Sequence, residues 1–186
     1  KWHGEIAFKK SIGSDDSTAQ VLTPMDKKMI MIMPYAMQSG DGSSSLILGL
    51  TNTRKLNEDI VWANQLKRKA VVSESDWSFG DQTEFNSWIQ YPFSEQVSVS
   101  TRLKIIDQDV LSGRNPLIMA PVQTANPKNY GGTEVFLGLG MNINFDSFLG
   151  GNDSIGIEIL KPVDQNKNNL QMKTDYHIII GYQKSL

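Results

Sequence analysis

Apolar and polar residues alternate along much of this chain, which is the pattern of a β-strand with two different faces. The clearest apolar alternations are at Val97, Val99, Thr101, Leu103 and Ile105, at every odd position from Val135 to Phe145, at Ile155, Ile157 and Ile159, and at Tyr176, Ile178, Ile180 and Tyr182. Apart from Phe136 and Ile179, the positions between them carry serine, glycine, asparagine, histidine and charged residues. Because successive side chains of a strand point to opposite faces, each of these strands has one apolar face and one polar face.

Weaker alternation predicts further strands, and almost no segment has the spacing of an amphipathic helix. These weaker strands are expected over residues 2–12, 29–37, 45–50, 59–66 and 83–91. Segments rich in turn residues separate them, so we expect about nine strands joined in sequence as antiparallel hairpins, in one domain over residues 1–186. The longest connection, about 111–132, contains Pro116, Pro121 and Pro127 and is expected to be an exposed loop.

Alternation alone does not distinguish a barrel in lipid from a sandwich in water. Two features favour the barrel. The expected strands run for about 9 to 12 residues, which is the length that a tilted membrane strand needs. The polar faces also contain glycine and ionisable residues, which a wet lumen accommodates and a dry core does not. We therefore predict an all-β fold, an antiparallel up-and-down transmembrane β-barrel.

Such a barrel would place the polar faces of the strands in its lumen, where their charges would select the solutes that pass. The lumen-lining residues predicted in this way are Glu5, Arg102, Lys104, Glu134, Asn142, Asn144, Glu158 and His177. In a soluble sandwich the same residues would form a solvated face.

Composition excludes several other classes. The chain has 18 basic and 20 acidic residues, interspersed along its length, so no basic surface for nucleic acid is expected. It has no cysteine, and no run of about 18 apolar residues that could form a membrane-spanning helix. No nucleophile elbow, phosphate loop, dinucleotide fingerprint or zinc-protease motif occurs, and the pair Asp107 and Asp109 has no third acidic ligand at a catalytic spacing. We expect neither an enzyme nor a cofactor.

Several short motifs resemble a family of bacterial outer-membrane proteins related to the phenol-degradation meta-pathway protein, often labelled "transporter". The motifs are residues 34–40 (PYAMQSG), 131–132 (GG) followed by 137–142 (LGLGMN), 158–162 (EILKP), 170–175 (LQMKTD) and 181–186 (GYQKSL). Family members usually continue the first motif as a Gly-Ser-Gly turn, whereas this chain has Ser39-Gly40-Asp41-Gly42.

The resemblance implies a Gram-negative outer-membrane location and a porin-like transport role, without identifying a solute. It also implies that this chain is the C-terminal part of a larger barrel, with further strands before a segment like residues 2–13. The alternating strand that ends near Leu186 resembles the C-terminal strand by which the barrel-assembly machinery recognises its clients, although Leu186 stands where phenylalanine is usual. The expected partners are therefore outer-membrane lipid, lipopolysaccharide and that machinery.

Three other groups of residues suggest binding chemistry. Met29, Met31 and Met33 share one face of an expected strand, and their thioether sulfurs could hold a soft ion such as Cu(I), or could simply face lipid or a plug. His3 and His177 lie on the first and last expected strands and would be neighbours in a closed barrel, as a metal or pH-sensitive pair or as solvated lumen residues. The run 67–69 (KRK) could meet lipopolysaccharide phosphates at an outer rim, or could be a charged strand end or hairpin tip.

The sequence therefore predicts an outer-membrane β-barrel channel or transporter that passes small solutes, hydrophobic or aromatic ones among them, through a charge-lined lumen. Two alternatives remain at this point. One is a soluble or surface β-sandwich that acts as a binding or structural module, and the other is a methionine-based copper-handling protein.

Overall fold

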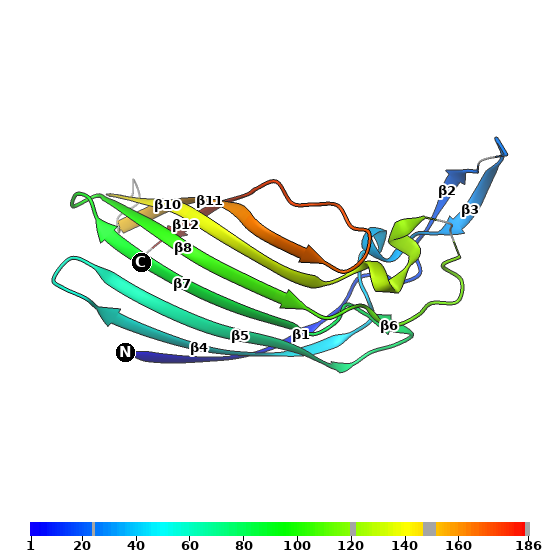
Figure 1. The fold of residues 1–186 in the computed structure, drawn as a ribbon, viewed down its shortest axis with the longest axis horizontal. Coiled ribbons are helices and arrows are strands. Elements are labelled where there is room, and N and C mark those ends of the chain that lie inside the picture. The colour runs from blue at the N-terminus through cyan, green and yellow to red at the C-terminus, as the bar shows by residue number, and fades with distance from the viewer. Residues whose placement is uncertain (24, 120–121, 147–151, 185–186) are drawn as a thin grey trace.

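One antiparallel sheet of eight strands makes up most of the fold, in the order β1-β4-β5-β7-β8-β10-β11-β12 (Figure 1). The computed structural model describes residues 1–23, 25–119, 122–146 and 152–184. The strands are β1 (Trp2–Lys10), β4 (Ser44–Lys55), β5 (Val61–Ser73), β7 (Gln82–Pro92), β8 (Val97–Gln108), β10 (Gly132–Asp146), β11 (Asn152–Lys167) and β12 (His177–Lys184). Each pairs with the next one in this order, so the prediction of an all-β antiparallel fold with up-and-down order is confirmed.

The sheet curls into a half-barrel that remains open. Its two edges, at β1 and β12, lie 19 Å apart. The curl gives the sheet a concave face and a convex face, as the trough-like outline of Figure 1 shows. The eight strands of this sheet therefore do not close on themselves.

Smaller elements lie beyond one end of the sheet. The hairpin of β2 (Thr18–Leu22) and β3 (Lys28–Ile32) projects away from it (Figure 1). Nearer to the sheet, β6 (Trp77–Ser78) pairs with β9 (Ser112–Gly113). Three single turns of 3₁₀ helix are also present, η1 (Tyr35–Met37), η2 (Gln123–Ala125) and η3 (Pro127–Asn129). In the described residues no helix is long and apolar enough to cross a membrane.

Two of the weaker strand predictions were wrong in their limits. The expected strand over 29–37 ends as β3 at Ile32, because Pro34 follows and the chain then turns into η1. The expected strand over 45–50 ends too early, because β4 continues through residues 51–55 and pairs with β5 along this whole length. Its threonines and asparagine are turn-like residues that a ladder between two flanking strands accommodates.

The register assigns every strand residue to one of the two faces. Phe136, Leu160, Ala63 and Asn86 lie on the same face and are almost completely buried, as expected where side chains crowd on the inside of a curl. The opposite, convex face exposes a continuous set of apolar side chains: Ile6, Phe8, Leu48, Leu50, Leu66, Leu137, Leu139, Ile159, Ile178 and Ile180.

A hydrophobic cluster closes the end of the sheet beside β6, and we call it the cap. Its buried members are Tyr35, Trp77, Leu111, Ile118 and Ala125, with Ile32, Phe79 and Tyr130 packed against them. Three of these buried residues come from the long connection 111–132. The prediction of a simply exposed loop there was therefore wrong in part, because its apolar residues have a buried partner surface that the local sequence does not reveal.

Candidate functional site: the concave face

All eight residues predicted to line a lumen lie on the concave face. The register of β8, β10 and β11 brings Arg102, Gly138 and Leu160 into one lateral row, and Ser100, Gly140 and Glu158 into the next. The remaining predicted residues follow from the same alternation, on β1, β8, β10 and β12: Glu5, Lys104, Glu134, Asn142, Asn144 and His177. His177 stacks on the buried ring of Phe136, with 5.1 Å between the ring centroids.

Ion pairs connect these charges, and two of them cross an intervening strand. Arg102 Nε on β8 donates to Glu158 Oε1 on β11 at 2.7 Å, and Lys67 Nζ on β5 lies 3.3 Å from Glu5 Oε2 on β1. The strand between each pair carries glycine at the crossing. A Cβ on Gly49 would lie 3.2 Å from Glu5 Cβ and Oε2, and one on Gly138 would lie 2.7 Å from Leu160 Cδ2 and 3.4 Å from Glu158 Oε1. The absence of a side chain therefore provides the space in which the ion pairs form.

Two further ion pairs complete the row of charges. Lys104 Nζ lies 3.3 Å from Glu84 Oε2, and Glu84 Oε1 accepts a hydrogen bond from the amide of the buried Asn86. Lys167 Nζ lies 3.0 Å from Glu134 Oε1. The guanidinium of Arg102 also lies over the ring of Trp88, 5.3 Å from its centroid.

The residues that the sequence prediction missed are Lys67, Glu84, Trp88 and Lys167. Lys67, Glu84 and Trp88 share the parity of the polar positions in their strands, which is the one signal that could have identified them. Lys167 does not share the parity of Glu158, because the register between β10 and β11 shifts by one residue between Val135 and Phe136.

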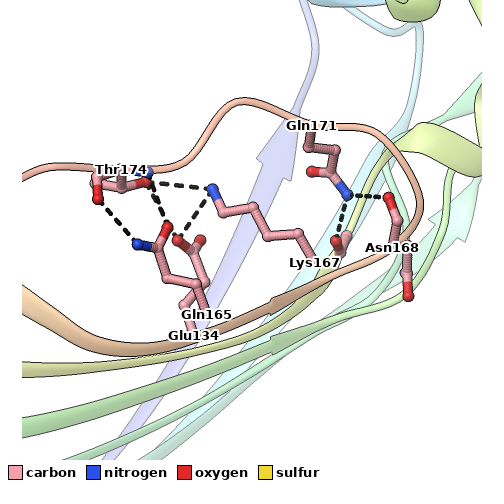
Figure 2. A network of polar contacts seen from close by, with 7 residues as sticks. Glu134, Gln165, Lys167, Asn168, Gln171 and Thr174 are labelled. Carbon is pink, nitrogen blue, oxygen red and sulfur yellow. Dashed lines mark hydrogen bonds and ion pairs between the residues drawn. The ribbon is translucent and has the colours of Figure 1, made fainter.

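The connection between β11 and β12, residues 168–176, folds back over the concave face, and we call it the strap (Figure 2). The side-chain amide of Gln165 donates to Thr174 O at 3.0 Å and accepts from Thr174 N at 2.8 Å. Thr174 Oγ1 accepts from Lys167 Nζ and donates to Glu134 Oε1, each at 3.2 Å. The strap therefore covers the Lys167–Glu134 ion pair, and Thr174 bonds to both of its members.

The strap is anchored at its other end by Gln171, whose Nε2 donates to Gly131 O at 2.8 Å and to Asn168 O at 2.7 Å (Figure 2). β11 stops pairing with β12 well before the strap, for a local reason. The pairing of β11 with β12 extends only as far as Leu160 and His177, and Pro162 follows with no N–H to donate.

At the cap end of the face, Asp41 is buried beside two lysines. Its Oδ1 accepts from Ser43 N at 3.1 Å and from Ser43 Oγ at 2.8 Å, and its Oδ2 accepts from Phe79 N at 3.3 Å. Burial by itself would raise the pKa of Asp41, but these hydrogen bonds and the charge of Lys9 together hold its pKa below the usual 3.8.

The other predicted groups lie on the β2–β3 hairpin and on the two edge strands of the sheet. Met29 and Met31 lie on one face of the β2–β3 hairpin opposite Val21 and Ala19, while Met33 follows the end of β3. His3 and His177 lie on the two edge strands, which are 19 Å apart, so they are not neighbours in this sheet. Among the described residues there is no group of three or more histidine, cysteine or carboxylate side chains that could hold a metal ion.

The run Lys67-Arg68-Lys69 was expected at a strand end or hairpin tip, and that expectation was wrong. It lies within β5, so its side chains alternate between the faces. Lys67 and Lys69 lie on the concave face, whereas Arg68 lies on the convex face and pairs with Asp81 at 2.8 Å. The three charges therefore do not form one patch that could meet a phosphate surface.

Comparison with known proteins adds no relative. No family model, no curated protein and no solved structure matches this chain.

Proposed function

We propose that this sheet is the greater part of an outer-membrane β-barrel channel, with the convex face toward lipid and the concave face toward a water-filled lumen. The observation that carries the proposal is the contrast between the two faces. The convex face exposes aliphatic side chains across all the strands, such as Leu139 at 73% and Ile180 at 72%, while the concave face carries four ion pairs. In water that apolar surface would be exposed to solvent, whereas in a bilayer lipid tails would bury it.

Strand length and aromatic placement support the same proposal. The eight strands are 8 to 16 residues long, and a tilted membrane strand needs about 9 to 11. Aromatic side chains lie on the convex face near the strand ends opposite the cap, at Trp2, Trp62, Tyr91, Phe145 and Tyr182. A ring of such residues at the membrane interface is typical of outer-membrane barrels.

The lengths of the connections suggest an orientation. At the end opposite the cap, residues 56–60 and 93–96 form short turns, while the connections on the cap side, 11–43, 74–81, 109–131 and 168–176, are longer. Outer-membrane barrels have short periplasmic turns and long extracellular loops. The cap end would then face the outside, and Arg68 and Asp81 would mark the outer edge of the lipid-facing band.

The 19 Å gap between the edges suggests how the barrel closes. Adjacent strands are about 4.8 Å apart, so a straight bridge needs about three more strands. The even strand number of bacterial barrels then favours about twelve in all. The additional strands would pair with β1 and β12, as expected for a chain that is the C-terminal part of a larger barrel. Leu186, proposed as the closing residue of the signal for the assembly machinery, lies outside the described residues, which end at Lys184 with β12.

Passage through this channel would be passive. The strands form the wall, and the strap and the cap narrow the lumen from one end, so that no cofactor and no catalytic residue is needed. The lipid partners would contact the convex face, and lipopolysaccharide the outer edge of the band.

Two measurements test this function. Partitioning comes first: recovery of the folded protein in the aqueous phase without detergent would contradict the barrel and would favour the soluble module. Conductance follows, with the protein reconstituted in a planar bilayer. We expect discrete channels, and channels whose size is unchanged when Lys104 and Glu84 are exchanged for methionine and glutamine would contradict a lumen along this face.

A further inference from the structure

The strap, residues 168–176, continues the alternation of β12 without interruption. The parity of Ile178 and Ile180, on the convex face, falls in the strap on three apolar residues and one threonine: Tyr176, Thr174, Met172 and Leu170. The parity of His177, on the concave face, falls on polar residues: Asp175, Lys173 and Gln171. Because a strand alternates strictly, the strap has the sequence of a longer β12 with the same two faces.

β11 has an edge of matching length that no strand occupies. It pairs with β10 as far as Lys167, but with β12 only as far as Leu160. Among the described residues, no strand pairs with the other edge of residues 161–167. If β12 were extended into the strap, it would therefore find an open ladder beside it.

The register shows that such an extension fits. The next step after the pair Leu160 and His177 sets Lys161 opposite Tyr176. Val163 is the extra residue at which the register of β11 against β10 shifts by one, so beyond it Lys167 falls opposite Gln171, and both belong to the concave face. Residues 168–170 then remain for the loop, and three residues are a common length for a hairpin loop.

In its present position the strap is held mainly by side chains. The Gln165 amide bonds to the backbone of Thr174, and the Thr174 hydroxyl bonds to Lys167 and Glu134. Among the described residues, the backbone of 170–175 forms no hydrogen bond with another backbone group. Pairing with β11 would give this segment a backbone ladder, from which Pro162 would remove at most one bond.

The present position also leaves apolar side chains of the strap in solvent. Met172 is 91% exposed, and Leu170 and Tyr176 are each 62% exposed. Paired with β11, Met172 and Tyr176 would join the convex apolar face, and β12 would grow from 8 residues toward the 15 and 16 of β10 and β11. Each of the two positions therefore has stabilising contacts that the other lacks, which is what a two-state element requires.

We infer that the strap is a movable end of β12, which leaves the concave face when residues 171–176 pair with residues 162–167 of β11. The movement uncovers the Lys167–Glu134 ion pair. As an account of gating, this inference rests on the proposed function, because in a channel the departure of the strap would widen the lumen at the cap end. As an account of two alternative pairings, it does not need the membrane.

The test is hydrogen exchange over residues 170–176, measured by mass spectrometry on the folded, detergent-solubilised protein. Thr174→Val removes the hydroxyl that bonds to Lys167 and Glu134, and it keeps a β-branched side chain that suits a strand. We expect exchange to slow by at least about tenfold, because the loss of hydrogen bonds to charged groups shifts the equilibrium toward the protected ladder. A strap that only loosens would exchange faster.

Two further variants make the result specific. Thr101→Val is the matched control, the same substitution on the convex face of β8, and it should leave exchange over the strap unchanged. Met172→Pro with Lys173→Pro, added to Thr174→Val, should abolish the slowing. Adjacent strand residues direct their N–H groups to opposite sides, so one of the two prolines removes a donor that faces β11.

Each outcome decides between the two proposals. Exchange that is faster or unchanged in Thr174→Val, or slowing that survives the two prolines, would overturn the movable strap even if the protein conducts. Proline-sensitive slowing in a protein that forms no channel would sustain the movement and reject the channel. If the protein conducts, we also expect Thr174→Val, but not Thr101→Val, to spend more time than wild type at a larger conductance level.

Discussion

Replacement of Leu139 by arginine separates a lipid-facing sheet from a water-facing one. Leu139 is at the middle of β10, on the convex face between Thr101 of β8 and Ile159 of β11. Its side chain is 73% exposed and makes no hydrogen bond, so the substitution removes little packing within the protein. The substitution instead places a positive charge in the medium, water or lipid, that contacts this point of the sheet.

The expected magnitude differs greatly between the two solvents. Full burial of a leucine side chain is worth about 1.5 to 3 kcal/mol, so the loss of roughly a quarter of that burial costs about 0.5 kcal/mol in water. In a bilayer, an arginine on the lipid face costs about 2 to 4 kcal/mol at the midplane. The folding equilibrium in lipid should therefore fall by roughly 30- to 700-fold.

The assay is reversible urea unfolding of wild type and Leu139→Arg, folded into vesicles of one lipid composition. Leu117→Arg is the matched control, because Leu117 is also exposed but belongs to the long connection outside the sheet. We expect the control to unfold within about 0.5 kcal/mol of wild type. A Leu139→Arg variant that folds into vesicles as stably as the control would refute the assignment of the convex face to lipid.

Three further predictions concern the lumen face and the cap. Replacement of Arg102 by methionine and of Glu158 by glutamine, singly and together, should give a coupling free energy of about 1 to 2 kcal/mol in a double-mutant cycle. This lies between the values for exposed and buried pairs, because the two side chains are 31% and 14% exposed; a coupling near zero would mean that the pair does not hold β8 to β11. Trp77→Ala should reduce the free energy of unfolding by about 3 to 5 kcal/mol, since the side chain is fully buried in the cap. Proteolysis within residues 109–119 should become faster in this variant, and an unchanged rate there would argue against a cap built around this ring. The pKa of Asp41 is lower in the folded protein than its usual 3.8, so the stability it contributes should be complete above about pH 4 and should be lost as the pH falls through the folded value. The Asp41→Asn variant should lack this step in an acid titration of the free energy of unfolding, and a step that persists would belong to another carboxylate.

The period of the hydrophobic pattern was sufficient to predict the strands and the division of their side chains between two faces. It assigned Arg102, Glu134 and Glu158 to one face because a strand alternates strictly, whatever its neighbours are. The partners of these residues depend on register. Glu158 meets Arg102 across β10 only because Gly138 and Gly140 are level with both, and alternation within one strand carries no information about its offset from the next.

The cap could not be predicted for a different reason. Tyr35, Trp77 and Ile118 lie far apart in the sequence, each among proline, glycine, serine or asparagine residues. Trp77 and Ile118 belong to no periodic run, and Tyr35 lies in the segment 29–37, where alternation predicted a strand. Their burial arises from contacts between connections, such as the hydrogen bond from Asn115 N to the hydroxyl of Tyr35, which join segments 80 positions apart. Contacts between connections produce no regular hydrophobic spacing in the sequence, so the segment 111–132 was predicted to be an exposed loop.

Glycine at two positions of the concave face provides space for ion pairs, a role that only the register reveals. A central strand normally loses stability at a glycine, because the chain gives up more entropy and packs no side chain. At Gly49 and Gly138 the loss is offset by charge: each glycine lies between a cation on one neighbouring strand and a carboxylate on the other, and a Cβ would enter the path between them.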